Sequence, residues 1–222
     1  YAELAATLDD QYWVIAPDNP GFGNSDALPD GFSLLGCAQS IEMLLDHLGI
    51  QQCFLFGHHT GASIAVQLAA SAPQTVSRLA LCGPTLLGPE LKQALPGLGA
   101  AIPAVADGSH LMQMWQRLSA KESDSPASLL QRELSSAFKA GDAYPQAYAG
   151  VALQDFESQL RSLTIPVLVF AGTRDVLYPQ LQASFDCLQD GQIAEVEGAG
   201  SYICDRQATL VAQLLNGFYR HD

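Results

Sequence analysis

The sequence has 222 residues, of which 48% are hydrophobic and 15% are charged, and its formal net charge is −13. This composition predicts a folded globular chain with a substantial core and excludes a disordered one. The negative charge argues against nucleic acid or an anionic membrane surface as partner, because phosphate groups are bound by basic clusters. No apolar stretch is long enough to cross a bilayer, and no leader resembling a signal peptide is visible, so we expect a cytoplasmic protein.

The predicted elements alternate between strand and helix along the chain. Apolar runs and helical spacing of apolar residues predict strands at Tyr12–Ala16, Cys53–Phe56, Arg78–Cys82, Val167–Ala171 and Gln192–Val196, and helices at Phe32–Leu48, Gly61–Ala72, Gln180–Leu188 and Ala208–Tyr219. This alternation predicts an α/β fold with a mostly parallel sheet covered by helices on both faces.

The alternation is interrupted between Gly83 and about Phe156. Short helical patterns there are separated by Pro, Gly and Ala, which predicts a helical insertion over the sheet. We therefore divide the chain into a core (residues 1–83 and 157–222) and a lid (residues 84–156). Inserted segments of this kind commonly shape a pocket and exclude water from it.

A strand-to-helix turn follows the strand at Cys53–Phe56 and has the sequence Gly57-His58-His59-Thr60-Gly61. The flanking glycines are typical of a nucleophile elbow, a strained turn that raises one side chain above the sheet. Here the raised position is His59, where serine, cysteine or aspartate would be usual.

The order of elements and motifs resembles the α/β-hydrolase superfamily over essentially the whole chain. The elbow is preceded by Asp18-x-Pro20-Gly21-Phe22-Gly23-x-Ser25-Asp26, and Gly172-Thr173-Arg174-Asp175 matches the Gly-x-x-Asp turn after the penultimate strand. The first of these loops is typical of capped members such as epoxide hydrolases, haloalkane dehalogenases and carbon–carbon bond hydrolases. The resemblance implies an α/β-hydrolase fold with a helical lid, a small-molecule substrate or ligand, and no cofactor.

The chain departs from that family in three respects. The early strands and the His-Gly segment that supplies half of the oxyanion hole are missing, so Tyr12–Ala16 would lose its hydrogen-bonding neighbour; we expect the gene product to have a further N-terminal part. The nucleophile position holds His59. The loop Glu197–Tyr202 has Ser201 where relatives place the catalytic histidine.

The two altered positions suggest an exchange of base and hydroxyl. In an intact triad they lie within hydrogen-bond reach, so we predict His59 as general base, or less readily as nucleophile, with Ser201 as its partner. Asp175 would give electrostatic support, although its place in the family suggests that it lies too far from His59 to fix the tautomer. The backbone N–H of Thr60 would be an oxyanion donor. The alternative is an inactive ligand-binding protein on a hydrolase scaffold.

Three further residues are pocket candidates, each with an equally ordinary structural role. His58 could instead pack beside the elbow, His110 could begin a surface helix, and Trp115 could pack within the lid. A metal bridging His58, His59 and Asp175 is not expected, because adjacent residues on a tight turn should diverge. The oligomeric state is not predicted.

The five cysteines, Cys37, Cys53, Cys82, Cys187 and Cys204, are scattered and odd in number. They form no C-x-x-C pair and no Cys/His spacing typical of zinc. We therefore expect buried free thiols in a reducing compartment and no metal.

Overall fold

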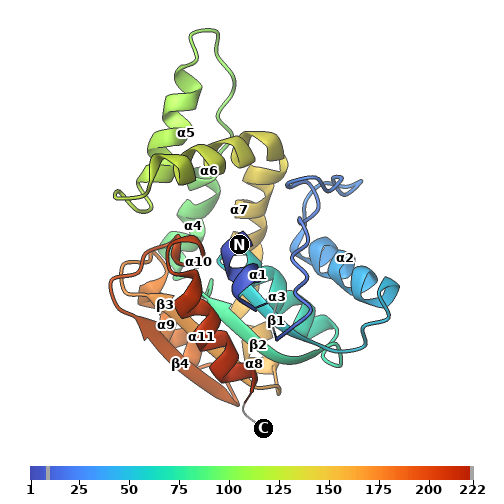
Figure 1. Ribbon diagram of the computed structural model, residues 1–222. Helices are drawn as coiled ribbons and strands as arrows, with labels where there is room; N and C mark the ends of the chain where they lie inside the picture. Colours follow the sequence, from blue (N-terminus) through green and yellow to red (C-terminus); the bar gives the residue numbers. More distant parts are fainter. Residues whose placement is uncertain (9–10, 221–222) are drawn as a thin grey trace.

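The computed structural model describes residues 1–8 and 11–220. Its centre is a four-stranded parallel sheet in the order β1-β2-β3-β4, formed by Cys53–His58, Val76–Cys82, Val167–Gly172 and Gly191–Val196 (Figure 1). Parallel neighbours need crossover connections, and helices supply all three. The first is α3, Thr60–Ser71; a longer helical segment joins β2 to β3; and the last contains the 3₁₀ helix η1, Tyr178–Gln180, and α9, Leu181–Phe185.

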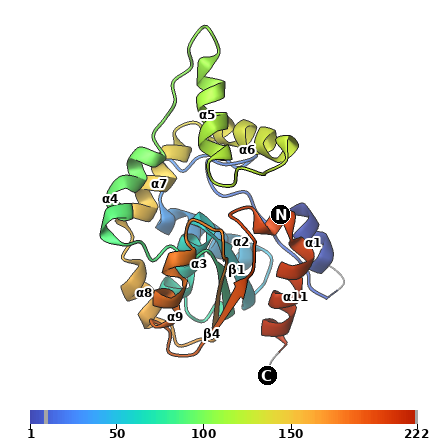
Figure 2. The same cartoon turned by 90° about the vertical axis from the view of Figure 1, so that its left-hand side faces the viewer.

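The two faces of the sheet bury different sets of helices. Side chains alternate along β2, so Leu79 and Leu81 face one core while Ala80 and Cys82 face the other. The first core is closed by α2, Leu34–His47, by α3 and by α8, Phe156–Ser162. The second is closed by α1, Ala2–Leu8, α10, Ile203–Arg206, and α11, Ala208–Tyr219 (Figure 2). The predicted parallel sheet with two covered faces is confirmed.

The prediction of a strand at Tyr12–Ala16 is wrong. These residues lie in an irregular segment, and Trp13 is 71% exposed. Among the described residues the segment has no ladder pairing with any strand of the sheet, although Tyr12 packs against Phe54 of β1, and without such pairing an extended segment gains little stability. In consequence β1 is an edge strand of the described sheet, and its Phe54 is 42% exposed.

The insertion (residues 84–156) follows β2 and ends at the first residue of α8. It contains four helices. They are α4, Pro89–Leu98, α5, Ser109–Ser119, α6, Ala127–Ala140, and α7, Ala143–Leu153. Helices α5 and α6 lie farthest from the sheet, with α4 and α7 between them and it (Figures 1 and 2). The insertion has a small apolar core of its own around Met114 and Leu130, which also contains Tyr202 from the loop after β4. Whether it acts as a lid stays a prediction.

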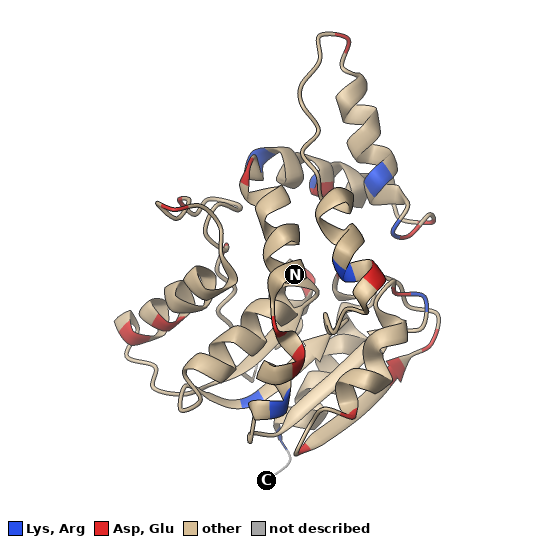
Figure 3. Cartoon of the chain, turned by 180° about the vertical axis from the view of Figure 1, so that it is seen from behind, with Lys and Arg blue, Asp and Glu red and all other residues tan. Residues whose placement is uncertain are grey.

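Charged side chains are spread over the surface. Figure 3 shows acidic positions on helices, loops and strands, with fewer basic positions among them. Among the described residues, no helix is long and apolar enough to cross a membrane.

Candidate active site

The elbow holds the backbone of His59 in a conformation that residues other than glycine rarely adopt. The residue lies between the end of β1 at His58 and the start of α3 at Thr60, with φ 51° and ψ −115°. Among the described residues it alone has a positive φ without being glycine. A Cβ at Gly57 would lie 2.3 Å from the carbonyl oxygen of Gly61, so this turn requires glycine there. Such strain is typical of functional positions.

His59 contacts Asp175 directly. The histidine Nε2 lies 2.8 Å from Asp175 Oδ2, although the two residues are 116 positions apart. Asp175 follows β3, its side chain is fully buried, and the backbone N–H of Leu177 donates to Oδ1 at 2.7 Å. The expectation that Asp175 lies too far from His59 is therefore wrong, because the raised imidazole reaches across the end of β2.

Gly83 leaves the space that this contact needs. It follows β2 with φ +58°, and a Cβ there would lie 2.4 Å from His59 Cδ2 and 2.7 Å from Nε2. The backbone is fixed on both sides, since His59 N–H donates to the Cys82 carbonyl and Gly83 N–H donates to the Phe170 carbonyl. Sequence reasoning did not identify Gly83 as part of the site.

The surroundings of the pair favour a neutral imidazole beside an ionised carboxylate. Burial and the neighbouring His58 lower the pKa of His59 below its ordinary value of 6.5, despite the opposing effect of Asp175. Burial would raise the pKa of Asp175, but the hydrogen bonds from His59 and Leu177 hold it below its ordinary value. Nε2–H then donates to Asp175, and Nδ1 carries the lone pair that can accept a proton.

The expected pair of His59 and Ser201 is not formed. Ser201 is buried, and its Oγ has no hydrogen-bond partner. The imidazole of His59 is hydrogen-bonded to Asp175 instead. The loop that carries Ser201 is held by hydrogen bonds to the insertion. Its neighbour Tyr202 donates its backbone N–H to Glu122 Oε2 at 3.0 Å and its hydroxyl to the carbonyl of Leu118.

Glu122 is a buried anchor between the insertion and this loop. It also pairs with the side chain of Arg206, and a Cβ at Gly200 would lie 2.5 Å from its carboxylate. We expect Glu122→Ala to lower the free energy of unfolding by about 2 kcal/mol, because the buried N–H of Tyr202 loses its acceptor and Arg206 keeps only its hydrogen bonds to Asp124. Urea unfolding measures this. In the control Asp124→Ala, whose side chain is 53% exposed, the loss should stay within about 0.5 kcal/mol. Equal losses in the two variants would contradict the anchoring role.

The other sequence candidates lie in different surroundings. Thr60 begins α3, so its N–H belongs to the first turn, where amides have no partner within the helix. His110 accepts the backbone N–H of Val105 through Nδ1 at 3.3 Å and packs edge-on against Phe138. Trp115 is partly buried against the core of the insertion. The contacts of His110 and Trp115 are thus packing contacts within the insertion.

His58 and His59 converge, contrary to expectation. Their ring centroids are 4.3 Å apart, and together with Asp175 they offer ligand atoms that all lie within 4.8 Å of one another. The reason given against a metal there, that the side chains diverge, is wrong, because the strained backbone of His59 turns its ring back over β1. The hydrogen bond between His59 and Asp175 nevertheless already occupies two of the three donors.

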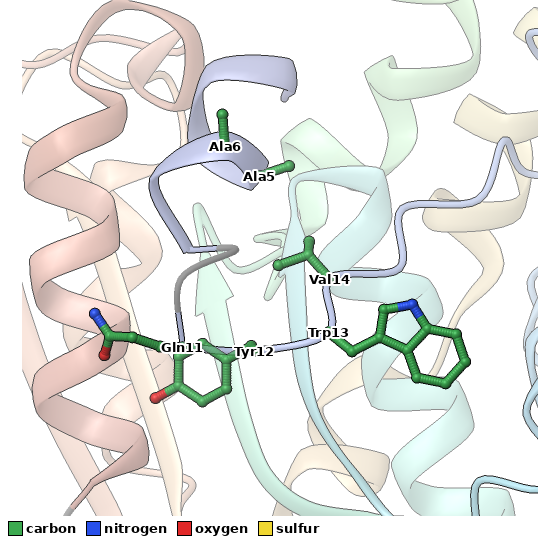
Figure 4. A pocket seen from close by; sticks show the side chains of 6 residues that line it. All are labelled: Ala5, Ala6, Gln11, Tyr12, Trp13 and Val14. Carbon is green, nitrogen blue, oxygen red and sulfur yellow. The ribbon is translucent and has the colours of Figure 1, made fainter.

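A surface hollow of about 580 Å³ lies beside the N-terminal segment and not at the elbow. Figure 4 shows its lining residues, Ala5, Ala6, Gln11, Tyr12, Trp13 and Val14. None of these side chains is a carboxylate, an imidazole or a thiol.

Comparison with known proteins agrees with the architecture. Residues 1–187 match the family model described as alpha/beta hydrolase fold. The 2-hydroxymuconate semialdehyde hydrolase of Pseudomonas putida is 29% identical over 214 residues, which cover 92% of this chain and 76% of that protein. The putative carbamate hydrolase RutD of Klebsiella pneumoniae is 42% identical over 77 residues, and this match spans 34% of the chain and only 29% of the relative.

A solved structure extends the agreement to nearly all of the chain. A thermophilic esterase from Thermogutta terrifontis superposes with a TM-score of 0.83 at 22% identity, covering 99% of this chain and 84% of its own. At that identity the likeness shows the fold alone.

Proposed function

Because the chain belongs to the alpha/beta hydrolase fold family, we propose that it hydrolyses small neutral organic substrates, with His59 as general base at the position of the nucleophile. The observation that carries this proposal is the 2.8 Å contact between His59 Nε2 and Asp175 Oδ2 on a strained elbow. A histidine oriented by a buried carboxylate is the unit that performs proton transfer in hydrolytic triads.

The geometry supports a mechanism with water as nucleophile. His59 Nδ1 takes a proton from water, and the hydroxide oxygen forms a bond to the carbonyl carbon of an ester while the π electrons move to the carbonyl oxygen. The N–H of Thr60 stabilises that oxyanion. The oxyanion collapses, the bond to the alkoxide breaks, and the protonated His59 returns its proton to the leaving oxygen. Asp175 stabilises the imidazolium between the two transfers.

The names of the relatives indicate which substrates to test first. They include a semialdehyde hydrolase, a putative carbamate hydrolase and an esterase. The net charge of −13 disfavours polyanionic substrates. We therefore favour uncharged esters, with the related cleavage of a carbon–carbon bond next to a carbonyl as a second reaction class.

A ligand-binding protein without activity is the second candidate function. It is favoured by the buried Ser201 hydroxyl, which has no partner and leaves the site without a hydroxyl positioned for attack. Binding would then use the same surface near His59, with no bond broken.

Product formation from a panel of small activated esters and carbamates at neutral pH separates the two functions. We expect turnover above the buffer rate and no initial burst, because water attacks directly and no acyl-enzyme accumulates. A stoichiometric burst would instead show that a covalent intermediate accumulates. Saturable binding of these compounds without any turnover would favour the ligand-binding function.

The pH dependence of turnover follows from the lowered pKa of His59. Only the neutral imidazole accepts a proton, so kcat/KM should fall as the pH drops through the pKa of His59 in the folded protein and should reach a plateau at higher pH. The midpoint of this acid limb is expected below 6.5, since burial and His58 both favour the neutral form. A pH–rate profile with its midpoint above 6.5 would contradict the assignment of the base.

A further inference from the structure

A second cluster of chemically active side chains adjoins the elbow and shares His58 with the group formed by His58, His59 and Asp175. His58 ends β1 and Cys82 ends β2, and the two are direct partners in the parallel register. Partners in register point to the same face of a sheet. That face is covered by α10, which places Cys204 over them. Both cysteines are buried, at 0% and 1% exposure.

The cluster presents three donors toward one point. One ligand atom each from His58, Cys82 and Cys204 lies within 4.8 Å of the other two. The Nδ1 of His58 is engaged by the hydroxyl of Tyr1 at 2.9 Å, whereas its Nε2 is buried and has no hydrogen-bond partner. Its interaction on this side is with the Cys204 thiol, and a thiol is only a weak hydrogen-bond partner for a buried ring nitrogen.

We propose that His58 Nε2, Cys82 Sγ and Cys204 Sγ bind a Zn²⁺ ion. Two thiolates and an imidazole are ligands that zinc prefers, and three protein ligands leave one of its four tetrahedral positions open. Bond lengths of about 2.3 Å to sulfur and 2.0 Å to nitrogen place tetrahedral ligands roughly 3.5 to 3.8 Å apart. The side chains therefore need only small rotations to close around an ion.

The surroundings of the cluster suit this occupant. Two thiolates neutralise the charge of Zn²⁺, so the complete site carries no net charge into the apolar core that Cys82 and Cys204 share with Phe170 and Ile203. A hydrogen bond from Nδ1–H to the hydroxyl of Tyr1 would orient the ring and leave the Nε2 lone pair for the metal, as outer partners do in zinc sites. Binding releases to solvent any proton that the two thiols still carry, and it would tie β1, β2 and α10 together.

Because the site is buried, the ion is best supplied during folding. Reduced protein is refolded with Zn²⁺, dialysed against a weak chelator and assayed for metal content. A parallel refolding with Co²⁺ reports the ligands through its thiolate-to-cobalt charge-transfer absorption. We expect one tightly held ion per chain, and a cobalt spectrum with thiolate ligation. Neither readout depends on turnover, so the site can fail while the proposed hydrolase stands, or the reverse.

Alanine variants of equally buried cysteines show which residues bind the ion. Cys82→Ala and Cys204→Ala should each lose stoichiometric binding, while Cys37→Ala, which removes another fully buried thiol, should keep it. Far-UV circular dichroism identifies any variant that fails to fold, and the wild-type cobalt spectrum then decides the ligand type alone. Absence of bound metal in the wild type, a cobalt spectrum without thiolate absorption, or binding lost in Asp175→Ala but kept in Cys204→Ala would overturn the proposal.

Discussion

Asp175→Asn is expected to lower kcat by about 10,000-fold, the loss seen when the carboxylate of a histidine–aspartate pair is replaced by its amide. The carboxylate accepts Nε2–H of His59 and leaves the Nδ1 lone pair free. An amide that turns its NH₂ toward Nε2 favours the other tautomer, whose Nδ1 carries the proton and cannot accept one. It also removes the negative charge that stabilises the imidazolium.

Steady-state kinetics of this variant should be read beside His59→Ala, which sets the activity remaining without the base. Asparagine has almost the size of aspartate, so the fold should be retained and the loss should lie in kcat with KM little changed. The control is Asp124→Asn, which removes an exposed carboxylate of the insertion and should leave kcat unchanged. Wild-type kcat in Asp175→Asn would show that the carboxylate does not act through His59.

The fold could be predicted from local patterns because each core element carries its own signal. The apolar run before Gly57 and the small residues after Gly61 predicted β1, the turn and α3, and the structure confirms them. The failure at Tyr12–Ala16 has a physical cause, since a strand exists only through its neighbours and the sequence pattern reports burial alone.

The candidate site was predicted less completely, because its contacts cross long distances in the chain. The sequence identified His59 and Asp175 as members of one site, but their direct contact depends on the backbone angles of the elbow and on the space above Gly83. The pairing of Ser201 with His59 was inferred from an exchange of residue types. In the structure the loop of Ser201 is instead bound by Glu122 of the insertion.

The cluster of His58, Cys82 and Cys204 could not be predicted from sequence motifs, because its residues also come from distant parts of the chain. Cys82 and Cys204 lie far apart in sequence, and neither stands at a spacing typical of zinc. Sheet register aligns His58 with Cys82, and only the packing of α10 adds the third donor. Spacing motifs detect ligands on one loop or helix, and they miss ligands that three separate elements bring together.

Gly83→Ala is expected to lower kcat by about 100-fold, although residue 83 carries no chemistry. The added Cβ would meet the imidazole of His59 at 2.4 Å, and backbone hydrogen bonds on both residues prevent the main chain from yielding. The ring must therefore rotate away from Asp175. A displacement of about 1 Å in a catalytic group costs roughly this factor in rate.

A second glycine separates this clash from the cost of the backbone conformation. Gly83 and Gly49 both have a positive φ, of +58° and +71°, so the backbone conformation alone should cost alanine about 1 kcal/mol of stability at either position, and the clash with His59 adds to that cost at Gly83. A Cβ at Gly49 has nothing within 4 Å, and Gly49→Ala should therefore keep the wild-type kcat. Kinetics and urea unfolding of both variants give the comparison. Activity lost in a folded Gly83→Ala and kept in Gly49→Ala would show that the imidazole must lie against Asp175, whereas unchanged activity in both would place the chemistry away from this pair.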